Sequence, residues 1–218
     1  MATNLDLYIT AIRETLLIVV ASSIISYIIG LPLGVILAVT SKNGISPKPV
    51  INQVLGVIIN IFRSIPFLIL LILVLPVTKM LVGTTIGPIA VIPPLVFSAA
   101  PYIARMVESS IMEVDYGVIE AARSMGASDF QIITKVLLTE ARPNLMVGVA
   151  ITTTTILGYS AMAGVVGGGG LGDVAIRYGY YRYENAIMFV TVIILVILVQ
   201  VIQESFLAIS RKIDKRAK

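Results

Sequence analysis

Five long runs of the chain are almost free of charge, and this feature most limits what the chain can fold into. Arg63 is the only charged residue inside them, and they span Thr15 to Val39, Pro49 to Thr78, Met80 to Ala104, Pro143 to Gly172 and Asn185 to Gln203. A helix needs about 20 mostly apolar residues to cross the roughly 30 Å hydrocarbon core of a bilayer. The runs therefore predict an all-α integral membrane protein with about five transmembrane helices.

The composition supports this prediction and excludes several kinds of chemistry. Charged residues make up 13% of the 218 residues, whereas a soluble domain carries about 25%. The chain contains no cysteine and no histidine, so it cannot build a Ser-His-Asp triad, a thiol nucleophile or a histidine-ligated metal site. It also lacks the GxxxxGK[ST] phosphate loop. We expect no catalytic, cofactor-binding or metal-binding residues, and a protein that is not an enzyme.

The positions of Lys and Arg predict how the chain lies in the membrane. With five spans, 11 of the 16 basic residues fall on one side and four on the other, and Arg63 lies inside a run. Because basic residues collect on the cytoplasmic side, the amino terminus is predicted to be outside and the carboxyl terminus inside. The basic tail from Arg211 to Lys218 suits anionic lipid headgroups. Its place beside a span argues against nucleic-acid binding.

Two features of the runs bear on energy coupling. They contain no Asp or Glu, which are the usual intramembrane relays of proton-coupled and ion-coupled carriers. Arg63 has two interpretations: it is either a snorkelling anchor near the membrane surface or a charge that pairs across a subunit or pathway contact.

The polar segment from Pro101 to Arg142 has the pattern helix, glycine, helix. Asp115 can cap a first helix and Gly126 can end it in the left-handed conformation. Ser128 has the capping-box spacing for a second helix that runs until Pro143. This elbow is predicted to face the cytoplasm.

The elbow itself allows two interpretations. It can dock in a groove of a soluble partner, with close approach at Ala121 and Ala122 and apolar contacts from Ile119, Met125 and Phe130. Alternatively, it forms an amphipathic pair of helices that lies on the membrane surface.

The elbow sequence resembles a known family. Residues 120–126 read EAARSMG, and after nine further residues 136–139 read VLLT; this is similar to the EAA loop of ABC importer permeases, which ends in I-x-L-P. The resemblance implies a type I ABC importer permease fold, with one permease domain over 1–218 and a coupling loop over 101–142. Its ATPase-coupling residues would be Glu120, Ala121, Ala122, Met125 and Gly126.

The sequence departs from the family pattern at two positions. Val136 replaces the isoleucine, which is a mild change, and Thr139 replaces the proline. Because Thr139 does not fix the backbone as proline does, Pro143 is the nearest residue that can shape the following turn.

Three further stretches narrow the resemblance. Residues 60–67 (NIFRSIPF), 100–108 (APYIARMVE) and 158–164 (GYSAMAG) are similar to methionine-import permeases. This implies a homodimer in the bacterial inner membrane that forms the pathway for L-methionine, with D-methionine as a second candidate. Its partners would be two ATPase subunits, which bind ATP and Mg, and an external substrate-binding protein or lipoprotein. An importer of another amino acid or a small peptide is the alternative.

The fourth run holds the candidate pathway residues. Tyr159, Ser160 and Met162 place two hydroxyls and a thioether near its middle, although helix packing explains small and polar residues equally well. The glycine-rich stretch 167–172 is interpreted as pliant backbone at a helix end. Two rival functions are a channel or ion-coupled carrier, in which the elbow has no role, and a membrane scaffold without substrate-dependent ATP hydrolysis.

Overall fold

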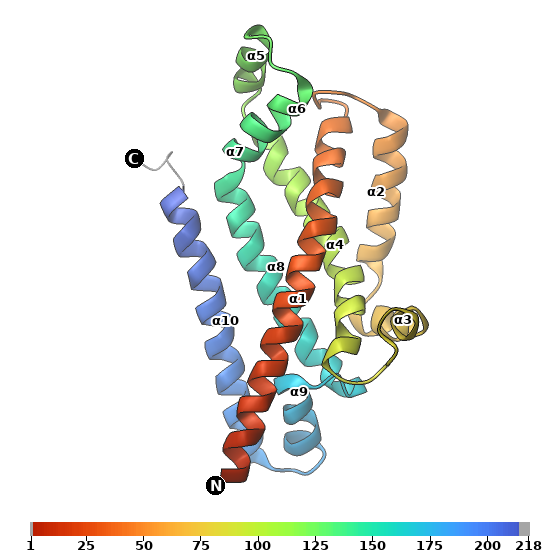
Figure 1. Ribbon diagram of the computed structural model, residues 1–218, viewed down its shortest axis with the longest axis vertical. Coiled ribbons are helices and arrows are strands. Elements are labelled where there is room, and N and C mark those ends of the chain that lie inside the picture. The colour runs from red at the N-terminus through yellow and green to blue at the C-terminus, as the bar shows by residue number, and fades with distance from the viewer. Residues whose placement is uncertain (1, 214–218) are drawn as a thin grey trace. The chain divides into compact units, whose positions relative to one another are not determined.

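The computed structural model describes residues 2–213, so most of the basic tail lies outside the described residues. Within that range the chain is helical and has no strand (Figure 1). Four spans are continuous, and a fifth is sharply broken into two shorter helices. They are α1 (Ala2–Thr40), α4 (Pro88–Met112), α8 (Arg142–Met162) with its short extension to Val166, α10 (Asn185–Ile213), and the broken pair α2 (Pro49–Ser64) and α3 (Phe67–Val82). The prediction of about five spans is confirmed.

The third span differs from its predicted bounds. It was expected over Met80 to Ala104, but α3 continues to Val82 and α4 occupies Pro88–Met112. Gly83 ends α3 in the left-handed conformation, with φ +78°, and its N–H donates to the carbonyl of Lys79. Hydropathy alone does not register such a glycine stop, because Gly83 sits inside an apolar stretch.

The structure therefore brings acidic residues into the spanning helices. Glu14 lies in α1, which begins well before the predicted Thr15, and Glu108 lies in α4. Both acids lie outside the predicted runs, in parts of the helices that extend beyond them. The first twelve residues of the predicted 101–142 loop are likewise the last three turns of α4.

The described chain forms two compact units. Unit 1 comprises Met1–Ser26, Ile65–Ala99 and Thr152–Gln203, and unit 2 comprises Tyr27–Ser64, Ala100–Ile151 and Glu204–Lys218. Several long helices contribute one part to each unit, because the divisions fall within α1, α4, α8 and α10.

In unit 1, hydrogen bonds join the glycine-rich stretch 167–172 to α1. Gly167, Gly169 and Gly170 all have positive φ, between 71° and 75°. The amide of Gly170 donates to Glu14 Oε2 at 2.7 Å, and the amide of Leu171 donates to Thr15 Oγ1 at 2.9 Å. The prediction of pliant backbone is wrong, because side chains of α1 hold these amides in place.

The same stretch is also tightly packed. A Cβ added to Gly164 would overlap the backbone of Gly172, and one added to Gly172 would overlap the carbonyl of Ala161. Beside it, Leu171 is fully buried in a cluster that joins the start of α1, the short helix α9 (Gly170–Val174) and α10. Glycine is therefore required here for close approach as well as for φ.

Unit 2 contains the second core and a partly buried ion pair. Leu37, Ile59 and Ala104 form a buried cluster between α1, α2 and α4. The guanidinium of Arg105 lies 2.7 Å from Glu108 Oε2, and its Nη2 donates to the carbonyl of Gly56 and to Asn60 Oδ1, each at 3.1 Å. Arg105 therefore ties α4 to α2 through the backbone as well as through charge.

Candidate functional site

The first arm of the elbow is α5 (Tyr116–Ser124), and both its ends are capped as the sequence predicts. The carboxylate of Asp115 accepts from the amide of Gly117 at 2.6 Å. At the other end Gly126 has φ +81°. Its N–H donates to the carbonyl of Arg123 at 2.9 Å, and the N–H of Ala127 donates to the carbonyl of Ala122 at 3.1 Å. These two bonds are the Schellman pattern, in which the left-handed residue ends the helix.

The second arm begins with the predicted capping box. Ser128 Oγ accepts from the amide of Gln131, and the Gln131 side chain accepts from the amide of Ser128 at 2.9 Å. The arm then runs through α6 (Asp129–Gln131), a π-helical segment over Ile132–Leu137 and α7 (Leu138–Glu140). π-helical turns occur frequently at functional sites.

The second arm ends before Pro143, where the sequence predicted that it would stop. The arm ends at Glu140, a single turn residue, Ala141, follows, and α8 starts at Arg142. Pro143 therefore stands in the first turn of α8, where its missing N–H has no helical partner to lose. Thr139 lies inside α7, and the chain passes into α8 without the family proline.

The elbow exposes most of the residues that resemble the coupling signature. Glu120, Ala121, Met125 and Gly126 are exposed, and Met125 keeps 81% of its surface accessible. Phe130, on the second arm, is 74% exposed. Figure 1 shows α5 beyond the end of α2, and both helices belong to unit 2.

Two of the predicted contact residues face inward instead. Ala122 is 5% exposed and Ile119 is 8% exposed. Both lie on the face of α5 that packs within unit 2, three residues apart, as a helix places neighbours. Ile119 and Ala122 are therefore turned into unit 2, whereas Met125 and Phe130 form the outward pair. The coupling role of Ala122 stays a prediction.

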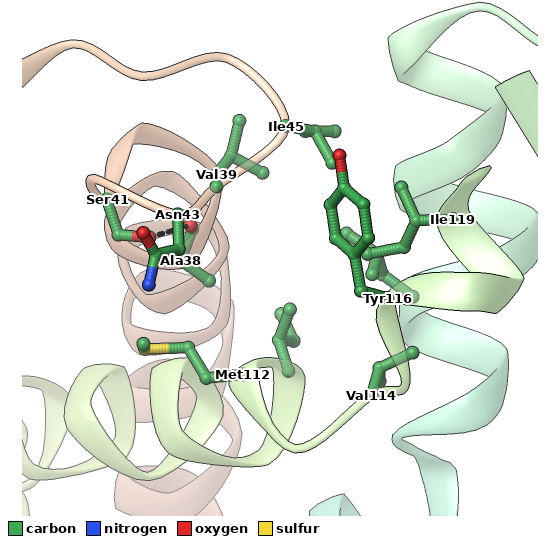
Figure 2. A pocket seen from close by; sticks show the side chains of 12 residues that line it. Ala38, Val39, Ser41, Asn43, Ile45, Met112, Val114, Tyr116 and Ile119 are labelled. Atoms are coloured by element: carbon green, nitrogen blue, oxygen red, sulfur yellow. Dashed lines mark hydrogen bonds between the residues drawn. The ribbon is translucent and has the colours of Figure 1, made fainter.

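The inward face of α5 meets the loop 41–48, which we name the strap. One end of the Arg123 guanidinium donates to the carbonyl of Ile45 at 2.5 Å, and the same Nη2 lies 3.8 Å from Asp129 Oδ1. A cavity of about 200 Å³ separates the remaining surfaces. Figure 2 shows Tyr116 and Ile119 of the elbow on one side of it and Val39, near the end of α1, on the other. No local sequence pattern indicates the bond between Arg123 and Ile45, because 78 residues separate its partners.

The structure separates the three candidate pathway residues. The ring of half-buried Tyr159 stacks on Phe67, with centroids 4.6 Å apart and planes 3° from parallel. Ser160 is buried and its hydroxyl donates to the carbonyl of Leu157 in its own helix at 2.7 Å. Met162 is 47% exposed. Of the three, Met162 has an exposed side chain, whereas the Ser160 hydroxyl already donates a hydrogen bond within its own helix.

Arg63 lies in the last turn of α2, where it is exposed. A cation near a helix C-terminus is favourable because the last carbonyls carry partial negative charge. The neighbouring Ser64 hydroxyl donates to the carbonyl of Asn60. Across residues 2–213, no three acidic side chains gather closely enough to hold a metal ion.

A helical membrane protein with a capped, exposed elbow of this kind has clear counterparts among known proteins. Residues 30–218 match the family model of the binding-protein-dependent transport system inner membrane component. The chain belongs to this family. The resemblance to ABC importer permeases is thereby confirmed, and the chain is a multi-pass membrane component of a transport system and not an enzyme.

Individual relatives are similar over nearly the whole chain. The probable D-methionine transport system permease protein MetI of Vibrio cholerae is 51% identical over 215 residues, covering 99% of this chain and 96% of that protein. The methionine import system permease protein MetP of Bacillus subtilis is 46% identical and covers 83% of this chain and 82% of its own length. A chain of the inward-facing MetNI methionine ABC transporter is 44% identical, with a TM-score of 0.97 over 99% of this chain and 100% of that one. The predicted type I permease fold is confirmed.

Proposed function

We propose that this chain is the membrane-spanning permease subunit of an ATP-driven methionine importer. The single observation that carries this proposal is the exposed elbow, capped at Asp115 and turned at Gly126, on a fold shared with a methionine ABC transporter. The names of the relatives support methionine as the substrate, and those from several bacteria specify the D enantiomer. Both enantiomers are therefore expected substrates.

The mechanism follows from how the elbow is built. Two copies of the chain form a pathway, and each elbow seats in one ATPase subunit that binds ATP and Mg. Met125 and Phe130 supply apolar surface at this contact, Glu120 supplies charge, and Ala121 permits close approach. ATP closes the ATPase pair, and the elbows convert that movement into a switch between outward and inward access. ATP can shift the equilibrium between the outward and inward states only by the difference between the free energies with which the ATPase binds the elbow in each.

Orientation and the external partner complete the proposal. The elbow faces the cytoplasm, the amino terminus lies outside and the carboxyl terminus inside the bacterial inner membrane, in agreement with the excess of Lys and Arg on one side. A substrate-binding protein delivers methionine to the outer face, which fits a family described as binding-protein-dependent. Met162, with Tyr159 stacked on Phe67, contributes apolar surface to the pathway.

The test is uptake by a reconstituted complex. Liposomes containing this chain and its ATPase, with the binding protein added outside and ATP inside, are given labelled L-methionine or D-methionine. An ATPase variant that cannot hydrolyse ATP serves as the control. Uptake that requires hydrolysis and is displaced by unlabelled methionine supports the proposal.

Two results would contradict it in different ways. Uptake of another amino acid, without methionine uptake, would overturn the substrate and keep the importer. Uptake that is equal with the inactive ATPase would overturn ATP coupling and favour a channel or carrier.

A further inference from the structure

We propose that Arg123 is a positioning residue, which fixes the elbow to the end of α1 through the strap and so carries the elbow's movement into that helix. This inference rests on the proposed function. Arg123 is not one of the residues expected to contact the ATPase. Its proposed action is on the strap.

The strap is firmly attached to α1. Backbone bonds run from Ser46 N–H to the carbonyl of Val39 at 3.1 Å and from Lys48 N–H to the carbonyl of Thr40 at 3.0 Å. The side-chain amide of Asn52 donates to the carbonyl of Leu37 at 2.8 Å. These bonds satisfy the last carbonyls of α1, which have no partner inside the helix. The strap therefore moves as an extension of α1.

The elbow meets the strap through one directional bond. The Ile45 carbonyl that accepts from Arg123 lies in the middle of the strap, and the Ile45 side chain is 8% exposed. Because the donor is a cation, this bond is stronger than one between neutral groups. The contact between Arg123 and Asp129, at 3.8 Å between half-exposed side chains, is by comparison weak in water.

The cavity explains why this one bond matters. Close packing alone fixes two surfaces when their side chains interdigitate, but about 200 Å³ of open space lies where the strap and the end of α1 approach the elbow and the end of α4. Figure 2 shows that space bordered by Tyr116 and Ile119 on one side and by Val39 and Ala38 on the other. Packing at this contact is therefore incomplete, and Arg123 adds the directional bond that fixes the elbow against the strap.

The functional test measures coupling in the assembled complex. Arg123→Met keeps an unbranched stem of similar length and removes every donor. In the reconstituted complex we expect the number of methionine molecules imported per ATP hydrolysed to fall about tenfold, as the loss of one charge-assisted hydrogen bond of about 1.5 kcal/mol implies. Lys135→Met is the matched control, because Lys135 is also an exposed cation of the elbow but lies on its second arm. It should leave the ratio unchanged.

A second measurement does not depend on transport. The native chain has no cysteine, so Lys48→Cys and Ser124→Cys place two spin labels at exposed positions on the strap and on α5. The labelled permease is assembled with its ATPase and with an excess of unlabelled permease. Arg123→Met should broaden the distribution of distances between the labels, and Lys135→Met should not.

The outcomes separate this inference from the proposed function. An unchanged label distribution, or an unchanged import-to-hydrolysis ratio in an assembled Arg123→Met complex, would overturn it. If the wild-type complex fails to import methionine, the substrate proposal is wrong and the spin labels still decide the role of Arg123. If Arg123→Met does not assemble, Arg123→Gln is measured instead, because its shorter side chain cannot reach as far as the guanidinium that donates to Ile45. An unchanged ratio in that variant also overturns the inference.

Discussion

Replacement of Gly126 by valine should uncouple ATP hydrolysis from uptake through the backbone alone. Gly126 has φ +81°, and no atom lies within 4 Å of a Cβ added to it. A side chain at this position therefore meets no neighbour inside the permease. The substitution instead costs conformational free energy, because a β-branched residue strongly disfavours the left-handed conformation.

The size of the effect follows from that penalty. For an L-residue the left-handed conformation costs about 1–2 kcal/mol. Since each 1.4 kcal/mol changes an equilibrium about tenfold, the population of correctly turned elbows should fall roughly 5- to 30-fold. Gly126→Asn should show a smaller loss, because asparagine visits this conformation more readily.

The assay compares uptake with ATP hydrolysis at equal amounts of assembled complex. Gly83→Val is the matched control, because Gly83 also ends a helix at φ +78° and also has no atom within 4 Å of an added Cβ. The two variants carry similar backbone strain, but only Gly126 lies in the elbow. Coupled uptake at the wild-type level in Gly126→Val, or equal uncoupling in Gly83→Val, would refute the reasoning.

Three further substitutions test the packing of the two units by thermal unfolding in detergent. Gly172→Ala should lower stability by about 1–3 kcal/mol through overpacking. Gly158→Ala should not, because no atom lies within 4 Å of the new methyl. Equal melting temperatures of these two variants would contradict the close approach at Gly172. Thr15→Val leaves a buried amide without its acceptor and should cost about 1–3 kcal/mol, while Ser110→Ala removes a buried hydroxyl that donates to a carbonyl of its own helix and should cost less. Arg105→Lys keeps the charge near its carboxylate but cannot hold both of its other acceptors, and an unchanged melting temperature would show that those bonds do not stabilise unit 2.

The features that sequence reasoning predicted are those set by near neighbours. The cap at Asp115, the turn at Gly126 and the capping box at Ser128 each depend on residues within five positions, and all three are present. The apolar runs predicted the spans for the same reason, since hydropathy is a local property.

The features that it missed depend on residues far apart in the chain. Ala122 is buried, and the bond between Arg123 and Ile45 joins residues that are 78 positions apart. The glycine-rich stretch looked pliant because glycine has few backbone restrictions, but side chains of α1 and close backbone contacts remove that freedom. No local pattern carries this information.

The bonds from Glu14 and Thr15 to the glycine-rich stretch also impose an order on biosynthesis. The chain emerges from its amino terminus, and each partner follows 156 residues later. Until then, the first helix is in place with a carboxylate and a hydroxyl that have not yet met these amides. Joining segments this far apart carries a loop-closure cost that local contacts avoid. Unit 1 can therefore close only after three-quarters of the protein has been made, and a chain stalled earlier exposes an unsatisfied acid in its first membrane helix.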